Sequence, residues 1–152
     1  MIKVEIVKCL KDNFSYIVHN NNEALVIDPS ESGPLIKSLD KLNLKLKYIL
    51  NTHHHFDHID GNLTLKEKYK CKIIGFIDDK KRIPGIDICL KNEEIFKEGD
   101  FQFKTYHTPG HTSGHICYHF FNEKILFTGD TLFSDRKSTR LNSSHRCISY
   151  AV

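Results

Sequence analysis

The sequence predicts a layered α/β domain, of the α+β kind, with strands inside and helices on the outside. Two patterns lead to this prediction. Short apolar runs of strand type alternate with helical spacing in the first half of the chain, and the second half is more purely of strand type. The length of 152 residues corresponds to about one domain, which can bury a sizeable core without disulfides.

Strand-type runs recur along the chain. At the N-terminus, Ile2, Val4 and Ile6 alternate with charged residues, which is typical of a half-buried strand. Asparagines 20–22 supply a hairpin connection between two further runs, and Asp28-Pro29 ends the second of them. In chain order, strands are expected at 2–6, 14–19, 24–27, 46–50, 72–76, 101–103, 116–121 and 125–127.

Two helices are expected between these strands. Pro34 stands where the first turn of a helix tolerates proline, and Leu35, Ile36, Leu39 and Leu42 then share one face. A second helix is expected around 61–69, after a histidine-rich loop. A loop containing Arg-Ile-Pro-Gly at 82–85 separates this part from the strand-rich second half.

The composition is that of an ordinary globular protein, with 39% hydrophobic and 27% charged residues. No apolar run approaches the ~18 residues that a membrane-spanning helix needs. The first residues indicate a strand rather than a signal peptide, so a cytoplasmic or organellar protein with no membrane partner is expected. The five cysteines are odd in number and have no paired spacing, which favours free thiols in a reducing compartment.

Residues 52–58 carry the strongest chemical signal, Thr-His-His-His-Phe-Asp-His, directly after an apolar run. On a loop at a strand end, His53, His55, Asp57 and His58 can turn toward one point, where open α/β sheets usually place their sites. Imidazoles and carboxylates without thiolates favour a catalytic zinc or non-haem iron ion over a structural one. The alternative is a solvated loop that holds four histidines without a metal.

Two more loops offer ligands of the same kind. The glycine-rich turn 108–115 has His111 at its tip, and Thr128-Gly129-Asp130 places an acidic residue just past a strand. Three strand-end loops with histidine or aspartate side chains strengthen the metal-site prediction.

These motifs resemble the metallo-β-lactamase superfamily, whose mark is T-H-x-H-x-D-H followed by a downstream histidine and aspartate. The likeness is greatest to glyoxalase II, the hydroxyacylglutathione hydrolases, and it covers residues 1 to about 133. The resemblance implies an αββα sandwich, incomplete here in its second half. The supporting stretches are D-N-F-S-Y at 12–16, V-I-D-P at 26–29, I-L-N at 49–51, R-I-P-G at 82–85, T-P-G-H-T-S-G-H at 108–115 and F-T-G-D-T-L-F at 127–133.

The same resemblance implies the ligands of two divalent metal ions, zinc above all, with iron or manganese as alternatives. One ion would be held by His53, His55 and His111, and the other by Asp57 and His58, with Asp130 bridging both. Asp57 and Asp130 would also be catalytic, while the substrate-binding residues stay unassigned. Five other histidines are expected to be non-ligands: His54 points elsewhere, His107, His115 and His119 are structural, and His19 is exposed.

The implied reaction is hydrolysis of a small-molecule thioester: S-lactoylglutathione and water give lactate and glutathione. In this chemistry two metals share a water, and the resulting metal-bound hydroxide attacks the thioester carbonyl. Three alternatives remain open. They are an iron-dependent persulfide dioxygenase of the same fold, another hydrolase of the fold such as a lactonase, and a metal-binding fragment without catalysis.

Residues 135–152 differ in style from the rest, being rich in arginine and serine without an apolar period. They resemble the in-frame translation of a short-read sequencing adapter, with Arg146-Cys147 in the place of a sample index. The sequence thus predicts a truncated domain over 1–134 and a non-native, disordered tail over 135–152, the alternative being a natural basic tail.

Truncation would expose a sheet edge and apolar surface, so the chain as written is expected to be poorly soluble and to have little or no activity. The family's last metal-ligand histidine and its glutathione-gripping groups have no match here. The tail also carries the whole net charge of +3, so no nucleic-acid partner is expected.

Overall fold

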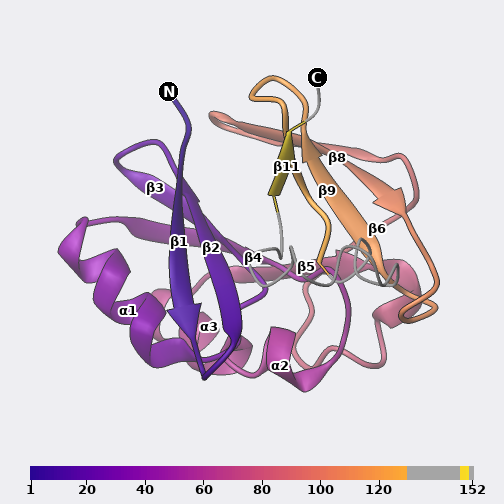
Figure 1. Ribbon diagram of the computed structural model, residues 1–152, viewed down its shortest axis with the longest axis horizontal. Helices are drawn as coiled ribbons and strands as arrows, with labels where there is room; N and C mark the ends of the chain where they lie inside the picture. The colour runs from indigo at the N-terminus through magenta and orange to yellow at the C-terminus, as the bar shows by residue number, and fades with distance from the viewer. Residues whose placement is uncertain (130–147, 151–152) are drawn as a thin grey trace.

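Two β-sheets face each other in the computed structural model, which describes residues 1–129 and 148–150 (Figure 1). Within these residues, one sheet has six strands in the order β1-β2-β3-β4-β5-β6, and the other has five in the order β11-β10-β9-β8-β7. β1 to β3 are antiparallel, β3 to β6 are parallel, and the second sheet is antiparallel throughout.

The strands of the first sheet are β1 (Lys3–Cys9), β2 (Asn13–His19), β3 (Glu23–Ile27), β4 (Lys45–Leu50), β5 (Lys72–Phe76) and β6 (Ile88–Leu90). Those of the second are β7 (Ile95–Glu98), β8 (Phe101–His107), β9 (Ile116–Phe120), β10 (Ile125–Phe127) and β11 (Ile148–Tyr150). The helices are α1 (Ser32–Lys41), the single turn α2 (Phe56–Ile59), α3 (Asn62–Tyr69) and the 3-10 turn η1 (Ile77–Asp79).

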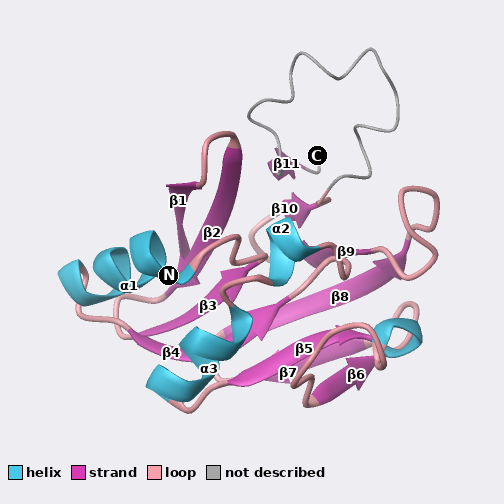
Figure 2. Cartoon of the chain, turned by 90° about the horizontal axis from the view of Figure 1, so that it is seen from below, coloured by secondary structure: helices cyan, strands magenta, loops and turns pink. Residues whose placement is uncertain are grey.

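The core has two layers, one on each face of the first sheet. Between the sheets, Leu25 and Ile27 of β3 pack in one cluster with Phe103 of β8 and Tyr118 of β9. On the other face, Leu35 and Leu39 of α1 and Leu65 of α3 are buried against the sheet. Figure 2 shows α1 and α3 along this side. The described residues thus form the α, β and β layers of the αββα arrangement.

The parallel strands place their following loops at one edge of the molecule. Backbone hydrogen bonds join these ends, because Asp28 N donates to Leu50 O (2.9 Å) and Asn51 N donates to Ile74 O (2.9 Å). The N–H of Ile116, at the start of β9, donates to Thr52 O (2.9 Å), which ties the second sheet to the same edge. Loops that carry polar side chains from both sheets therefore meet at this edge.

The sequence predicted most of these elements, although two residues lie elsewhere than expected. Ile6 is 61% exposed, since β1 buries Val7 and Cys9 on the helix side instead. His19 is buried rather than exposed, because Glu5 Oε2 on the neighbouring strand lies 2.9 Å from its Nε2. The contact with the Glu5 carboxylate offsets the free-energy cost of burying this polar ring.

Within residues 1–129, four short elements were absent from the sequence prediction: β6, β7, α2 and η1. None exceeds four residues, too short for a period to show. The turn α2 lies inside the histidine motif, where a loop was expected, and it places Asp57 and His58 on successive helical positions.

The predicted boundary between residues 134 and 135 stays a prediction. Of the proposed tail, the structure describes 148–150, as strand β11 paired with β10. None of the helices in the described ranges is long and apolar enough to cross a membrane.

Candidate metal centre

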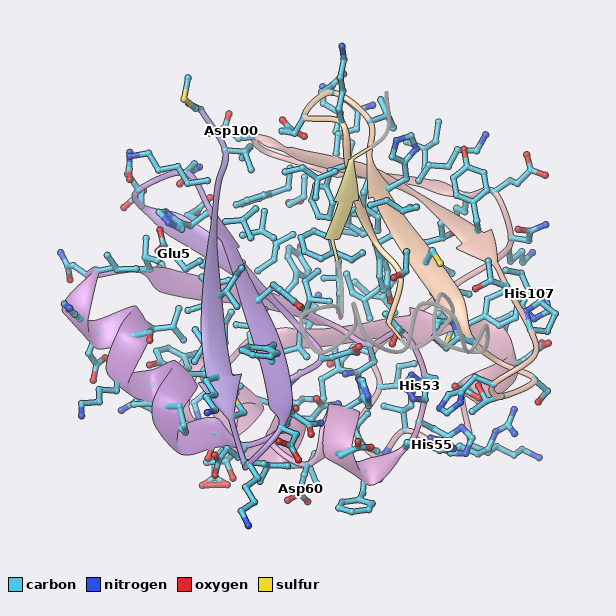
Figure 3. The ribbon with its side chains drawn as sticks, in the orientation of Figure 1. Glu5, His53, His55, Asp60, Asp100 and His107 are labelled. Atoms are coloured by element: carbon cyan, nitrogen blue, oxygen red, sulfur yellow. The ribbon has the colours of Figure 1, made fainter. Side chains whose placement is uncertain are left out.

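Three histidine side chains converge where strands of both sheets end. His53 and His55 lie on the segment that follows β4, and His111 lies on the loop that follows β8. His111 Nε2 is 3.0 Å from His55 Nδ1, and ligand nitrogens of all three lie within 4.8 Å of one another. Tetrahedral zinc, with Zn–N bonds of about 2.0–2.1 Å, spaces its nitrogens about 3.3 Å apart. The three imidazoles therefore fit one ion; Figure 3 shows His53 and His55 next to each other.

A buried carboxylate, Asp28, lies behind these imidazoles at the end of β3. Its Oδ1 accepts a hydrogen bond from Thr52 N (2.8 Å), and its Oδ2 accepts from Thr52 Oγ1 (2.6 Å) and His58 Nδ1 (2.9 Å). The backbone of Asp28 has φ 49°, in the left-handed region that aspartate tolerates better than most residues. Asp28 thus fixes both the start of the histidine motif and the ring of His58.

The hydrogen bonds of Thr52 settle the tautomer of His53. A hydroxyl has one proton, and Thr52 gives it to Asp28, so Thr52 Oγ1 can only accept from His53 Nδ1, 2.9 Å away. His53 Nδ1 therefore carries the ring proton, and Nε2 presents its lone pair. His58 follows the same logic through its own bond to Asp28. Metal-binding histidines are oriented by an acceptor on the far nitrogen in this way.

Asp57 and His58 form a second pair on α2, in which His58 is buried and Asp57 is half-buried. His58 Nε2 lies 3.8 Å from Asp57 Oδ2. Asn13 Nδ2, at the start of β2, donates to the carboxylate of Asp57 (3.2 Å) and to its carbonyl oxygen (3.1 Å). The β1–β2 hairpin therefore orients Asp57 from the opposite side of the site.

Asp28, His53 and His58 also have possible ligand atoms within 4.8 Å of one another. Asp28 Oδ2 already accepts two hydrogen bonds, one of them from the Nδ1 of His58. A metal ion here would displace the contacts that orient both imidazoles. We therefore assign Asp28 as a residue that orients the ligands rather than as a ligand.

Two further residues hold the strand ends in place. Burial raises the pKa of Tyr118 well above its ordinary value, and the charges of Asp28 and Asp79 add to this effect. The hydroxyl of Tyr118 thus stays protonated and donates a hydrogen bond to the carbonyl oxygen of Asn51 (2.6 Å), the residue directly before the histidine motif.

Gly129 has φ +56°, and a Cβ there would lie 2.5 Å from Thr52 Oγ1. The segment before Asp130 thus passes close to Thr52.

The structure brings His53, His55 and His111 together and places Asp57 and His58 beside them. Asp130 lies outside the described residues. His54 turns toward Asp79, with 3.6 Å between Nδ1 and Oδ1. His107 stacks on Phe76 and His119 lies on β9, while His115 is buried with its ring 4.9 Å from that of His53.

Asp28, Asn13 and Asp79 were not among the site residues predicted from the sequence. Asp28 and Asp79 share one signal that could have identified them: each is a carboxylate within three residues of the carboxyl end of a parallel strand, β3 and β5. Asn13 gave no such signal, because its partner Asp57 is 44 residues away.

A family model described as the metallo-beta-lactamase superfamily matches residues 11–143, most of the chain. The chain belongs to the metallo-beta-lactamase superfamily. This membership and the fold it implies confirm the predicted resemblance and the predicted fold.

The chain is similar to curated proteins named hydroxyacylglutathione hydrolase. That of Pelagibacter ubique is 55% identical over 135 residues, which are 88% of this chain and 56% of the relative. That of Methylococcus capsulatus is 40% identical over 136 residues, which are 88% of this chain and 53% of the relative. The chain spans about half the length of the curated relatives it matches.

Solved structures share the superfamily fold. The BLEG-1 B3 metallo-beta-lactamase is 27% identical with a TM-score of 0.79, covering 86% of this chain and 73% of that one. ETHE1 from Myxococcus xanthus is 22% identical with a TM-score of 0.70, covering 86% of this chain and 57% of that one, a likeness of fold alone.

Proposed function

We propose that this chain carries the metal centre of a thioester hydrolase of the glyoxalase II type, which converts S-lactoylglutathione and water to lactate and glutathione. The observation that carries the proposal is the convergence of His53, His55 and His111 in a chain 55% identical to a hydroxyacylglutathione hydrolase. Imidazoles are donors of a catalytic metal, and Thr52 already orients the far nitrogen of His53.

In this proposal, His53, His55 and His111 would hold one divalent ion. Asp57 and His58 would hold a second, and Asp130 would bridge the two. Zinc suits these nitrogen and carboxylate donors, and iron or manganese are the alternatives. When bound, such ions lower the pKa of a shared water and polarise the thioester carbonyl.

The chain's own residues prepare this chemistry. Asp28, through Thr52, keeps the ring proton of His53 on the nitrogen that faces away from the ligand side. Asn13 holds the carboxylate of Asp57, which would accept a hydrogen bond from the attacking water. The water oxygen would form a bond to the carbonyl carbon as the C–S bond breaks, with one water proton released to solvent and the thiolate taking up the other equivalent from solvent. The thiolate of glutathione then leaves without needing a strong acid.

A groove of about 500 Å³ adjoins the proposed ligands and gives the thioester a place to lie. Its walls combine apolar side chains with the proposed ligands His55 and Asp57, and Phe56 is 74% exposed there. The lining residues are Leu10, Lys11, Asp12, Asn13, His55, Phe56 and Asp57.

A single-turnover assay tests the proposal. The full chain, loaded with zinc and in excess over S-lactoylglutathione, is followed for loss of the thioester, because excess protein reveals even very slow hydrolysis. We expect zinc-dependent hydrolysis that is lost in His55→Asn. His119→Asn, which removes a histidine from β9 away from the three converging rings, is the matched control and should hydrolyse at the original rate.

Three results would contradict the proposal. Zinc binding without any thioester loss would favour a non-catalytic metal-binding fragment. One bound iron with oxygen consumption would favour a persulfide dioxygenase, and zinc-dependent cleavage of lactones alone would favour another hydrolase of the fold.

A further inference from the structure

A second buried carboxylate, Asp79, lies at the end of η1 directly after β5. Its side chain is 1% exposed, and neither oxygen accepts a well-aligned hydrogen bond from the residues that the structure describes. The guanidinium of Arg82 lies 2.9 Å from Oδ1 as an ion pair. A carboxylate buried with so few partners destabilises a fold, so its presence calls for a role beyond packing.

On one side, Asp79 faces the histidine motif. Nδ1 of His54 lies 3.6 Å from Asp79 Oδ1, and that nitrogen has no hydrogen-bond partner within the described ranges. His54 stands between His53 and His55 in the chain. A force on the His54 ring is therefore transmitted directly to the backbone of two proposed ligands.

On the other side, Asp79 faces the loop that carries His111. Arg82, the ion-pair partner, donates from Nη2 to Ser113 Oγ (3.2 Å). Gly114 packs so closely on the carboxylate that a Cβ there would lie 2.6 Å from Asp79 Cγ. Glycine at this position therefore lets the 108–115 loop rest on Asp79.

We propose that Asp79 is a positioning residue of the metal centre. It holds the 52–58 segment through His54 and the 108–115 loop through Arg82, Ser113 and Gly114, and so sets where His111 stands relative to His53 and His55. This inference rests on the metal centre of the proposed function and adds a residue that touches no metal. It also gives His54 a role as the contact between the motif and this carboxylate.

Hydrogen exchange in the metal-free full chain tests the positioning directly. Asp79→Asn keeps the shape of the side chain and removes its charge, and Asp78→Asn makes the same change at the exposed neighbour. We expect Asp79→Asn to speed amide exchange several-fold within 52–58 and 108–115, and to leave β1 to β3 at the original rate. Unchanged exchange in both loops, or equal acceleration throughout the chain, would overturn the inference.

Metal affinity, measured by competition with a chelator, supplies a second readout. Changes to groups that orient ligands typically weaken metal binding by about 10- to 100-fold, and we expect this for Asp79→Asn but not for Asp78→Asn. The visible absorption spectrum of the cobalt-loaded chain should shift in Asp79→Asn, because the ligand geometry changes. Equal affinities together with equal cobalt spectra would contradict the inference.

Ser113→Ala keeps the test decisive should Asp79→Asn fail to fold. This change removes only the hydrogen bond from Arg82 to the 108–115 loop. We expect several-fold weaker zinc binding at an unchanged midpoint of unfolding, and unaltered binding would count against the inference. None of these readouts uses thioester turnover. A chain whose metal binding depends on Asp79 but which never cleaves S-lactoylglutathione would refute the proposed function alone.

Discussion

Asp28 and His58, 30 residues apart in the sequence, meet at 2.9 Å between Oδ2 and Nδ1. Through this contact and its bonds to Thr52, one carboxylate orients two imidazoles of the site. The end of β3 thereby controls the chemistry of a motif that follows β4.

Replacing this carboxylate should lower both stability and metal affinity. Asp28→Asn fits the left-handed backbone, since asparagine tolerates φ near +50°, but it cannot accept all three hydrogen bonds. We expect the free energy of unfolding in urea to fall by about 2–3 kcal/mol, because hydrogen bonds to a buried charged group are lost. Asp60→Asn, at an exposed position, is the control. An equal effect of both changes would show that the contacts of Asp28 contribute little.

A methyl group at Gly129 should be poorly tolerated. Gly129 and Gly99 share φ +56°, yet a Cβ at Gly99 meets nothing within 4 Å, whereas one at Gly129 collides with Thr52 and His115. Gly99→Ala therefore reports the backbone cost alone, about 1 kcal/mol. Gly129→Ala should cost about 1–3 kcal/mol more by the same unfolding measurement. If the two variants are equally stable, Gly129 does not pack against Thr52 in solution.

Zinc should stabilise the chain against heat through His111. Ligand at 100 times its dissociation constant adds about 2.7 kcal/mol to the stability of the state that binds it. We expect zinc to raise the Tm of the original chain and of His119→Asn, but to have a much smaller effect on His111→Asn. Equal zinc-induced shifts in all three proteins would exclude His111 from the site.

Stability should fall at alkaline pH partly because of Tyr118. Burial raises the pKa of its hydroxyl, so the folded state holds the proton more tightly than the unfolded state. That contribution is complete below the unfolded pKa of about 10 and is lost as the pH rises toward the folded value, by up to about 1.4 kcal/mol per pH unit.

Tyr118→Phe tests this titration. The variant loses the bond to Asn51 O, which costs about 1 kcal/mol at pH 8. Its stability should then decline less steeply above pH 10 than that of the original chain. Tyr106→Phe, on the outer face of β8, provides the comparison, and parallel curves for Tyr118→Phe and the original chain would rule out Tyr118 as a source of the alkaline decline.

The sequence predicted the elements that show a period or a continuous apolar run, including the three-residue strand β10. The strand at 72–76 agrees with β5 residue for residue, and the helix with Leu35 and Leu39 on its buried face agrees with α1. Short strands such as β6 lack enough residues to show a period. The prediction that Ile6 shares a buried face with Ile2 and Val4 was wrong. The first part of β1 packs between the sheets, whereas its last part packs on the helix side.

Within the site, the local motif predicted which side chains would meet, but not what orients them. His53, His55 and His58 stand in one short run, whereas Asp28 and Asn13 act across 24 to 44 residues. Hydrogen-bond partners this far apart in the sequence meet because of the order of strands in the sheet. A local sequence pattern does not show that order. The same holds for His19, whose burial depends on Glu5 in the neighbouring strand.

The proposed ligands come from two sheets, since His53 and His55 follow β4 and His111 follows β8. Any change in how the sheets stack alters the separation of these nitrogens. Side chains of the inter-sheet core, such as Phe103 and Leu25, therefore act as spacers for the metal centre although they lie away from it. During evolution, substitutions there would be selected for ligand spacing as well as for stability, so we expect core volume to covary with the identity of the bound metal among relatives.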